Sequence, residues 1–415
     1  DRAMKWGFGW DFGPFEVWDA LGFKYTFDRM KEEGKKVPDW VEKMNGNGED
    51  CFYKYISGVK KYYNPDSSSY ESVEMPSDSL SFEISKESNN LILKNWSASL
   101  FNLGDDVAGV EFHSALKKEL NPIDGSILQT LDYALDWVSD HGFKGLVISG
   151  DGPNFCAGAN LNMILAMAER KDWDSINQVT ELMQNIMQKI RFSDFPVIAA
   201  PYGLVLGGGF ETIGACDRIV AAAESYVGLV EVGVGLIPGA GGNLRMISNL
   251  SSKMNSAMPG AFPVVQKAFE TVGFAKVGTS AHHAKSYGYL TEEDIIVPNR
   301  DQILSKSKKE VLKMSPEYKS PEVQSFKLPG ASGRLVIKSS IKSFVKAGKI
   351  SEHDALIAEK LGYVLTGGSK GGPLSPVDEQ YLLDIEREVF VGLCGEQKTL
   401  DRIGFMLKKG KPLRN

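Results

Sequence analysis

Two short segments of small residues carry the clearest chemical signal in this sequence of 415 residues. Glycine and alanine let a ligand approach the backbone closely, and the start of a helix offers N–H groups that have no partner inside the helix. Two such junctions facing each other would direct two N–H groups at one oxygen atom, which is an oxyanion hole. Each junction taken alone is equally compatible with a tight turn. The segments are Phe155-Cys156-Ala157-Gly158-Ala159-Asn160 and Leu206-Gly207-Gly208-Gly209-Phe210-Glu211.

Two glutamates add the groups that could move protons. Glu211 follows Gly208 by three residues, so both would lie near one face of a helix that begins there. Glu231 lies in the apolar stretch 228–233, where a carboxylate is costly unless it is paired or used in chemistry. Together the two acids could act as general base and general acid. The residues alone leave another interpretation open, with Glu211 on the surface and Glu231 in a structural ion pair.

The sequence around these residues alternates predicted strands with predicted helices. Apolar residues at helical spacing predict one helix around 128–138 and another around 176–190. Beyond about residue 300 the pattern is mostly helical. This alternation predicts an α/β fold with crossover connections, in which both small-residue segments lie at strand-to-helix junctions. Short apolar runs predict strands at 91–93, 100–103, 107–112, 145–149 and 197–200.

Composition and charge argue against several classes of function. The formal net charge is −6 and the pI is near 5.6, so we expect no nucleic-acid partner. The longest uncharged apolar stretch, 195–210, is shorter than the roughly 20 residues of a membrane span, so we expect a soluble protein with no membrane partner. Four separated cysteines without a CxxC pair indicate free thiols in a reducing cytoplasm, and no metal site is expected.

Residues from about 90 to 300 resemble the crotonase (enoyl-CoA hydratase/isomerase) superfamily. The resemblance rests on the order and spacing of the two small-residue segments, Pro196–Ala200, Cys216-Asp217, Glu231 and Ile237-Pro238-Gly239-Ala240-Gly241-Gly242. It implies a spiral of ββα turns capped by C-terminal helices. It also implies that the N–H groups of Ala159 and Gly208 form the oxyanion hole, and that Glu211 and Glu231 are catalytic. Further substrate contacts are implied for Ala157, Gly158, Asn160, Gly207, Pro238 and Gly239, although Asn160 stands where the family commonly has Asp.

The first residues have a resemblance of their own. The aromatic segment 3–22 is similar to the helical C-terminal domain of 3-hydroxyacyl-CoA dehydrogenases. We therefore expect a small all-helical remnant at 1–63, a linker at 64–82, the crotonase core at 83–300, and a helical region with an insertion at 301–415. The order of the parts resembles the C-terminal portion of a fused dehydrogenase–hydratase. The NAD-binding domain of that family has no counterpart in this sequence, so no cofactor is expected for these residues.

The resemblance implies an enoyl-CoA hydratase that adds water to trans-2-enoyl-CoA in fatty-acid β-oxidation. The substrate would be an acyl-CoA thioester, and a homo-oligomer is possible because crotonases commonly form trimers. Two alternatives stay open. One is an enoyl-CoA isomerase, for which Glu231 alone could carry the proton, and the other is a non-catalytic scaffold for a dehydrogenase partner.

Overall fold

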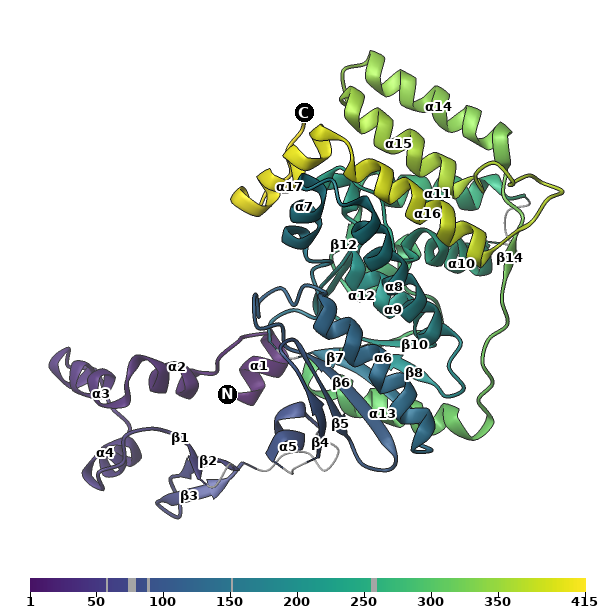
Figure 1. Cartoon of the computed structure of the whole chain (residues 1–415). Helices are drawn as coiled ribbons and strands as arrows, with labels where there is room; N and C mark the ends of the chain where they lie inside the picture. Colours follow the sequence, from purple (N-terminus) through teal and green to yellow (C-terminus); the bar gives the residue numbers. More distant parts are fainter. Residues whose placement is uncertain (57–58, 74–79, 88–89, 151, 255–259) are drawn as a thin grey trace. The chain divides into compact units, whose positions relative to one another are not determined.

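The computed structural model describes residues 1–56, 59–73, 80–87, 90–150, 152–254 and 260–415 (Figure 1). The chain forms two compact units, Asp1–Ser79 and Leu80–Asn415. Among the described residues, each helix is too short or too polar to cross a membrane.

The first unit is built from four helices and a three-stranded antiparallel sheet. Buried Phe23, Phe27 and Phe52 form its aromatic core. The sheet is joined to the helices by Asp19, whose carboxylate accepts hydrogen bonds from the backbone N–H groups of Phe52 and Tyr53. The elements are α1 (Arg2–Phe8), α2 (Pro14–Leu21), α3 (Phe23–Glu32), α4 (Asp39–Gly46), β1 (Tyr53–Ile56), β2 (Val59–Asn64) and β3 (Ser69–Ser72).

The expectation of an all-helical region at 1–63 is therefore wrong at its C-terminal end. Strand β1 pairs with β2, which pairs with β3, so residues 64–72 of the predicted linker belong to this sheet. The strands are rich in tyrosine and lysine, which are both amphipathic, so the alternation of polar and apolar residues that marks a strand is weak. Of the remaining linker, 74–79 lie outside the described residues, and the second unit begins at Leu80.

The second unit contains two main sheets that the chain visits in turn. A seven-stranded sheet has the order β13-β10-β8-β7-β6-β5-β4, with parallel pairing from β6 to β13 and antiparallel pairing from β4 to β6. A three-stranded sheet has the order β12-β11-β9. The strands are β4 (Leu91–Lys94), β5 (Ala98–Asn102), β6 (Val107–Phe112), β7 (Gly145–Gly150), β8 (Val197–Ala199), β9 (Gly203–Leu206), β10 (Arg218–Ala222), β11 (Ser225–Gly228), β12 (Val277–Gly278) and β13 (Ile295–Val297).

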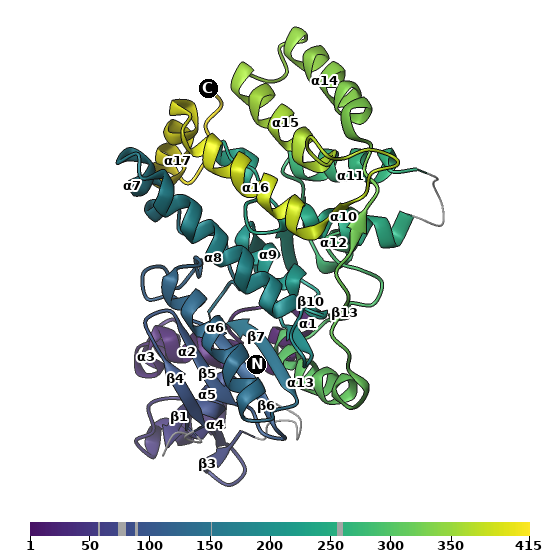
Figure 2. The same cartoon turned by 45° about the vertical axis from the view of Figure 1, so that its right-hand side comes forward.

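Helices cover both faces of the large sheet, so its central strands are buried on both sides. Helix α6 (Gly125–Asp140) packs on β5, β6 and β7, whereas α13 (Ile303–Met314) packs on β7 and β8 (Figure 2). All six residues of β6 are buried, as expected for a strand in a covered sheet. The strands predicted at 91–93, 100–103, 107–112, 145–149 and 197–200 are confirmed within one or two residues.

The turns of the chain after β7 bring the functional segments together. The chain passes from β8 directly into β9 and then into α9 (Gly208–Ala215), and from β10 into β11 and the short helix η1 (Glu231–Val234). Each of these turns therefore contributes one strand to each sheet before a helix begins. The other helices of this part are α5 (Phe82–Glu87), α7 (Leu161–Glu169), α8 (Trp173–Arg191), α10 (Gly242–Met254), α11 (Phe262–Gly273) and α12 (Ala281–Tyr287).

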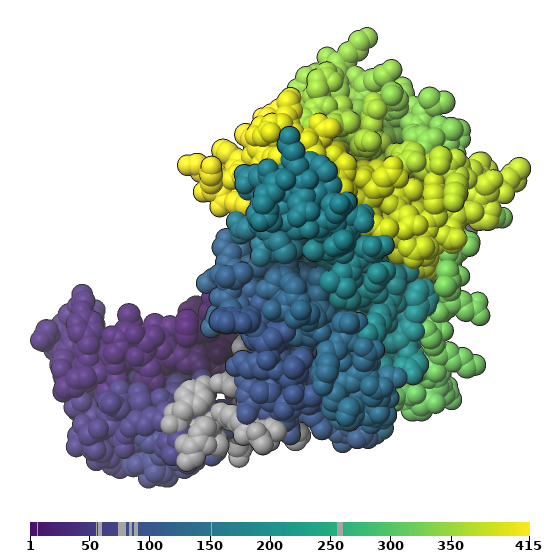
Figure 3. All heavy atoms as spheres, viewed as in Figure 1, coloured from purple at the N-terminus to yellow at the C-terminus, as the bar shows by residue number. Residues whose placement is uncertain are grey.

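The C-terminal region is mostly helical, as predicted for 301–415. Helix α16 packs against α8, and α17 packs against α7 and η1, so the last helices of the chain lie over the turns that carry the candidate site. In the space-filling view their yellow atoms adjoin the teal atoms of the α7–α8 region (Figure 3). The elements are η2 (Arg300–Gln302), η3 (Ser315–Glu317), β14 (Ser325–Phe326), α14 (Gly330–Lys346), α15 (Glu352–Leu365), β15 (Val377–Asp378), α16 (Glu379–Cys394) and α17 (Gln397–Lys409).

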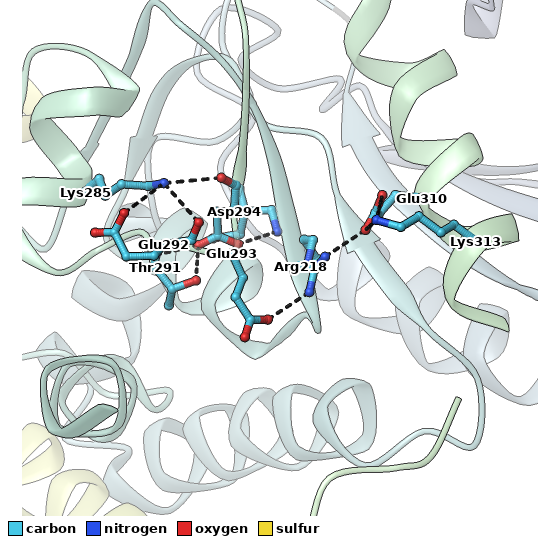
Figure 4. A network of polar contacts seen from close by, with 9 residues as sticks. Arg218, Lys285, Thr291, Glu292, Glu293, Asp294, Glu310 and Lys313 are labelled. Carbon is cyan, nitrogen blue, oxygen red and sulfur yellow. Dashed lines mark hydrogen bonds and ion pairs between the residues drawn. The ribbon is translucent and has the colours of Figure 1, made fainter. Parts of the chain in front are cut away.

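A polar network joins the edge of the large sheet to its covering helix (Figure 4). Arg218 on β10 pairs with Glu310 of α13 and with Glu293, each at 2.8 Å. The Asp294 carboxylate accepts hydrogen bonds from the backbone N–H groups of Ile219 and Thr291. These contacts hold the segment before β13 beside β10, and they have a structural role.

Candidate active site

The two small-residue segments meet where β9 ends and α9 begins. The backbone of Cys156 forms an isolated parallel β-bridge with Val205 of β9. The Gly158 carbonyl accepts a hydrogen bond from Ile123 N–H. Gly158 and Gly207 both have positive φ angles, 106° and 53°, which favour glycine at these two positions. A Cβ atom at Gly207 would lie 3.7 Å from Gly158 Cα, so the two loops touch.

The backbone N–H groups of Ala159 and Gly208 lie side by side at this contact. A Cβ atom at Gly208 would be 3.5 Å from the Ala159 nitrogen, and one at Gly158 would be 4.0 Å from the Gly208 nitrogen. Gly208 is the first residue of α9, so its N–H has no acceptor within the helix. Among the described residues, neither N–H group has a hydrogen-bond acceptor. The pair can therefore donate to one oxygen atom of a ligand.

Glu211 lies on the first turn of α9 and is 4% exposed. Its Oε1 atom accepts hydrogen bonds from the N–H groups of Ala240 (2.7 Å) and Gly242 (3.0 Å). Burial raises the pKa of Glu211 to about 7, although these backbone hydrogen bonds lower it. A carboxyl group with such a pKa can accept a proton near neutral pH. The interpretation of Glu211 as a surface residue is wrong.

Glu231 begins η1 and reaches the same place from the other side. Its Oε1 atom would lie 2.9 Å from a Cβ atom at Gly207, so only glycine leaves room for this carboxyl group. Its Oε2 atom is buried and has no hydrogen-bond partner among the described residues. Burial and the nearby carboxyl groups of Glu211 and Glu386 raise the pKa of Glu231 well above its ordinary value. Glu231 forms no ion pair with another described residue. The interpretation of Glu231 as a member of a structural ion pair therefore loses its support.

The sequence did not single out the third carboxyl group at the site, Glu386 of α16. It is 1% exposed and accepts hydrogen bonds from the N–H groups of Gly241 (2.6 Å) and Asn243 (3.0 Å). Glu211 and Glu386 thus bind alternate N–H groups of the segment 240–243. Burial, together with the charge of Glu211, raises the pKa of Glu386 to about 8. A glutamate in the middle of the apolar stripe of α16 is the signal that could have identified it.

All six residues with implied substrate contacts have partners inside the protein. The Gly158 carbonyl accepts from Ile123 N–H, and Gly207 N–H donates to the Gly228 carbonyl, each at 2.9 Å. Ala157 N–H donates to the Leu120 carbonyl at 2.7 Å, and Asn160 Oδ1 caps α7 by accepting from the N–H groups of its second and third residues. The carbonyl of Gly239 accepts from Gln184 Nε2 at 2.8 Å, and that of Pro238 accepts from Asn243 Nδ2 at 3.5 Å. These bonds fix the walls of the site. Contact of these residues with a substrate stays a prediction.

Comparison with known proteins agrees with this geometry. Residues 105–259 match the family model described as enoyl-CoA hydratase/isomerase. The chain is 42% identical to a protein of Bacillus subtilis (strain 168) named "Probable 3-hydroxyacyl-CoA dehydrogenase" over 417 aligned positions. This alignment covers 100% of this chain and 51% of that protein. It is 33% identical over 159 residues to the fatty acid oxidation complex subunit alpha of Aliivibrio fischeri, covering 37% of this chain and 23% of that protein.

The fold is also found among solved structures. The crystal structure of enoyl-CoA hydratase from Bacillus halodurans aligns with 74% of this chain and 99% of its own, with a TM-score of 0.50 and 15% identity. At that identity the likeness shows the crotonase fold alone. The chain spans about half the length of the first curated relatives that it matches. Residues 105–259, which carry Ala159, Gly208, Glu211 and Glu231, therefore form an enoyl-CoA hydratase/isomerase domain.

Proposed function

We propose that this chain catalyses the reversible addition of water to a trans-2-enoyl-CoA, giving a 3-hydroxyacyl-CoA. The observation that supports the proposal most is the placement of two carboxyl groups near the backbone N–H groups of Ala159 and Gly208. Glu211 is buried and accepts backbone hydrogen bonds, whereas the Oε2 atom of Glu231 is buried and has no partner among the described residues. The names of the two curated relatives further support a role in fatty-acid oxidation, within a longer protein that also has dehydrogenase activity.

The thioester carbonyl oxygen would bind between the N–H groups of Ala159 and Gly208. Negative charge grows on this oxygen when water adds to Cβ, and two fixed donors stabilise that charge without reorganisation. Loss of one such donor typically costs about 3 kcal/mol of transition-state stabilisation. The backbone thus polarises the double bond.

The two acids would divide the proton transfers. Glu211 takes one proton from the water, whose oxygen forms the new bond to Cβ, and Glu231 gives one proton to Cα. Before reaction Glu211 must be ionised and Glu231 must be protonated. The raised pKa of Glu231 favours its protonated form, and a pKa of about 7 leaves Glu211 ionised above neutral pH. Activity should rise with pH as Glu211 ionises near pH 7, and it should fall at higher pH as Glu231 loses its proton.

We expect Glu386→Gln to move the alkaline limb of this pH profile to lower pH. The negative charge of Glu386 favours the protonated form of Glu231, so its removal should lower the pKa of Glu231. The measurement is kcat/KM for crotonyl-CoA from pH 6 to 10. Glu388→Gln is the matched control, since Glu388 is exposed on the same helix. An unchanged alkaline limb in a folded Glu386→Gln protein would contradict the electrostatic role of Glu386.

The proposed reaction is tested by following the enoyl-thioester absorbance of crotonyl-CoA in water. Hydration removes the conjugated double bond, so the absorbance should fall until equilibrium is reached. Conversion of a 3-enoyl-CoA to a 2-enoyl-CoA without hydration would instead identify an isomerase. Absence of both reactions in a protein that binds acyl-CoA would favour the scaffold alternative.

A further inference from the structure

A cavity of about 820 Å³ lies in the C-terminal region, between α11, α14, α15 and η1. This volume is in the range of sites that bind small molecules. Helices α14 and α15 lie side by side next to α11 in both ribbon views (Figures 1 and 2). Helices α14 and α15 lie in 301–415, the helical region predicted to carry an insertion, whereas α11 and η1 lie in the predicted crotonase core at 83–300.

The walls of the cavity are mainly apolar. Helix α11 buries Val265 and Ala268 in the core, and it presents Phe262 and Phe269 on the cavity side. Across from it, α14 contributes a continuous face that includes Ile337 and Ile341. Phe274 and Val336, which also line the cavity, are each 52% exposed, so the cavity is open to solvent and a ligand can enter it. Exposed apolar surface of this kind is typical of binding sites.

The rim of the cavity carries cations without carboxylate partners. Neither Lys276 nor Lys349 forms an ion pair with another described residue, whereas the acids at the rim have partners. Asp354 binds Arg402 and Arg414, and Glu270 accepts a hydrogen bond from Gln266. The two lysines are therefore available to an anionic group whose apolar part occupies the cavity.

One wall connects the cavity to the catalytic site. Val232 lines the cavity and directly follows Glu231 in η1. This helix is held from the other side by Thr399 of α17, whose hydroxyl donates to the Gly235 carbonyl at 2.9 Å. A ligand in the cavity would thus contact the same short helix that places the Glu231 carboxyl group.

We propose that this cavity binds an aliphatic chain that carries an anionic head group. The choice of this ligand class rests on the proposed function, because the chemistry involves acyl thioesters. The ligand would be a free fatty acid, whose carboxylate binds Lys276 and Lys349 at the rim while its aliphatic chain fills the cavity. Because this ligand would contact η1, the catalytic site would respond to the fatty acid itself.

The proposal is tested by calorimetric binding of dodecanoate to the full chain. Affinity should fall about fourfold for each methylene removed from the probe, as expected for burial of an aliphatic chain. Ser340→Trp, on the cavity face of α14, should weaken binding at least tenfold. Ser339→Trp is the matched control, because Ser339 is exposed on the same helix but does not line the cavity.

Competition with CoA thioesters tests the choice of ligand. Neither crotonyl-CoA nor dodecenoyl-CoA should displace dodecanoate. Displacement by dodecenoyl-CoA alone would show that the cavity receives the acyl tail of a substrate, and it would overturn the proposal. Absence of dodecanoate binding, equal binding by Ser340→Trp, or a dimer that Ser340→Trp dissociates would each overturn the proposal. Because no turnover is needed, these results are independent of whether crotonyl-CoA is hydrated.

Discussion

Glu231→Gln is expected to reduce hydration of crotonyl-CoA by about two orders of magnitude or more and to abolish any isomerase side activity. Each reaction needs a proton delivered to carbon, and glutamine cannot deliver it. The measurement is kcat at the optimum pH of the parent protein. Glu224→Gln is a suitable control, since Glu224 is exposed in the turn between β10 and β11.

The same variant should not lose stability. The pKa of Glu231 is higher in the folded protein than in the unfolded chain, where it is near 4.5. The free energy of unfolding of the parent therefore decreases as the pH rises from the unfolded pKa through the folded pKa. Glutamine carries no such penalty, so the melting temperature of the variant should match or exceed that of the parent at pH 8. A variant that folds and retains the parent rate of hydration would show that Glu231 has been assigned the wrong role.

Glu211→Gln is expected to reduce hydration by about two orders of magnitude or more while leaving acyl-CoA affinity nearly unchanged. Glutamine can keep the oxygen that accepts from Ala240 and Gly242, so the segment 240–243 should hold its conformation. It cannot accept the proton of the water. The donors to the thioester are backbone groups, which the substitution leaves in place.

Two assays on Glu211→Gln separate the enzymatic alternatives. Isomerisation moves a single proton between carbons, so Glu231 could still support it when hydration of crotonyl-CoA is lost. If Glu211→Gln still converts a 3-enoyl-CoA to a 2-enoyl-CoA at the parent rate, Glu211 is needed for the proton transfer from water and Glu231 for the proton transfer to carbon. If the variant instead hydrates crotonyl-CoA like the parent, the one-acid isomerase becomes the better description of this site.

The sequence could predict the central part of the fold because its signals are local. Strands such as β6 and β7 are mainly apolar runs, and α8 has apolar residues at helical spacing, so each element is marked by its own residues. The strands β1–β3 carry a weaker signal. Tyrosine and lysine occupy both faces there, so the period of two is not visible in polarity alone.

The candidate site could be predicted only in part, for the same reason. Ala159, Gly208, Glu211 and Glu231 lie in segments whose small residues or apolar neighbours make them conspicuous. Glu386 lies 145 residues after Gly241, and its partners are backbone N–H groups, which leave no trace in the sequence. Its position in an apolar stripe could have flagged a buried acid, but only the packing of α16 shows what that acid binds.

The hydrogen bonds of Glu386 to Gly241 and Asn243 also set an order of events during synthesis. A growing chain leaves the ribosome from its N-terminal end, so Glu211 and the segment 240–243 emerge long before α16. Until α16 emerges, two of the four N–H groups at 240–243 lack their carboxylate acceptor. A nascent chain that ends before Glu386 therefore has an incomplete site, and all four N–H groups gain their carboxylate acceptors only after α16 has been synthesised.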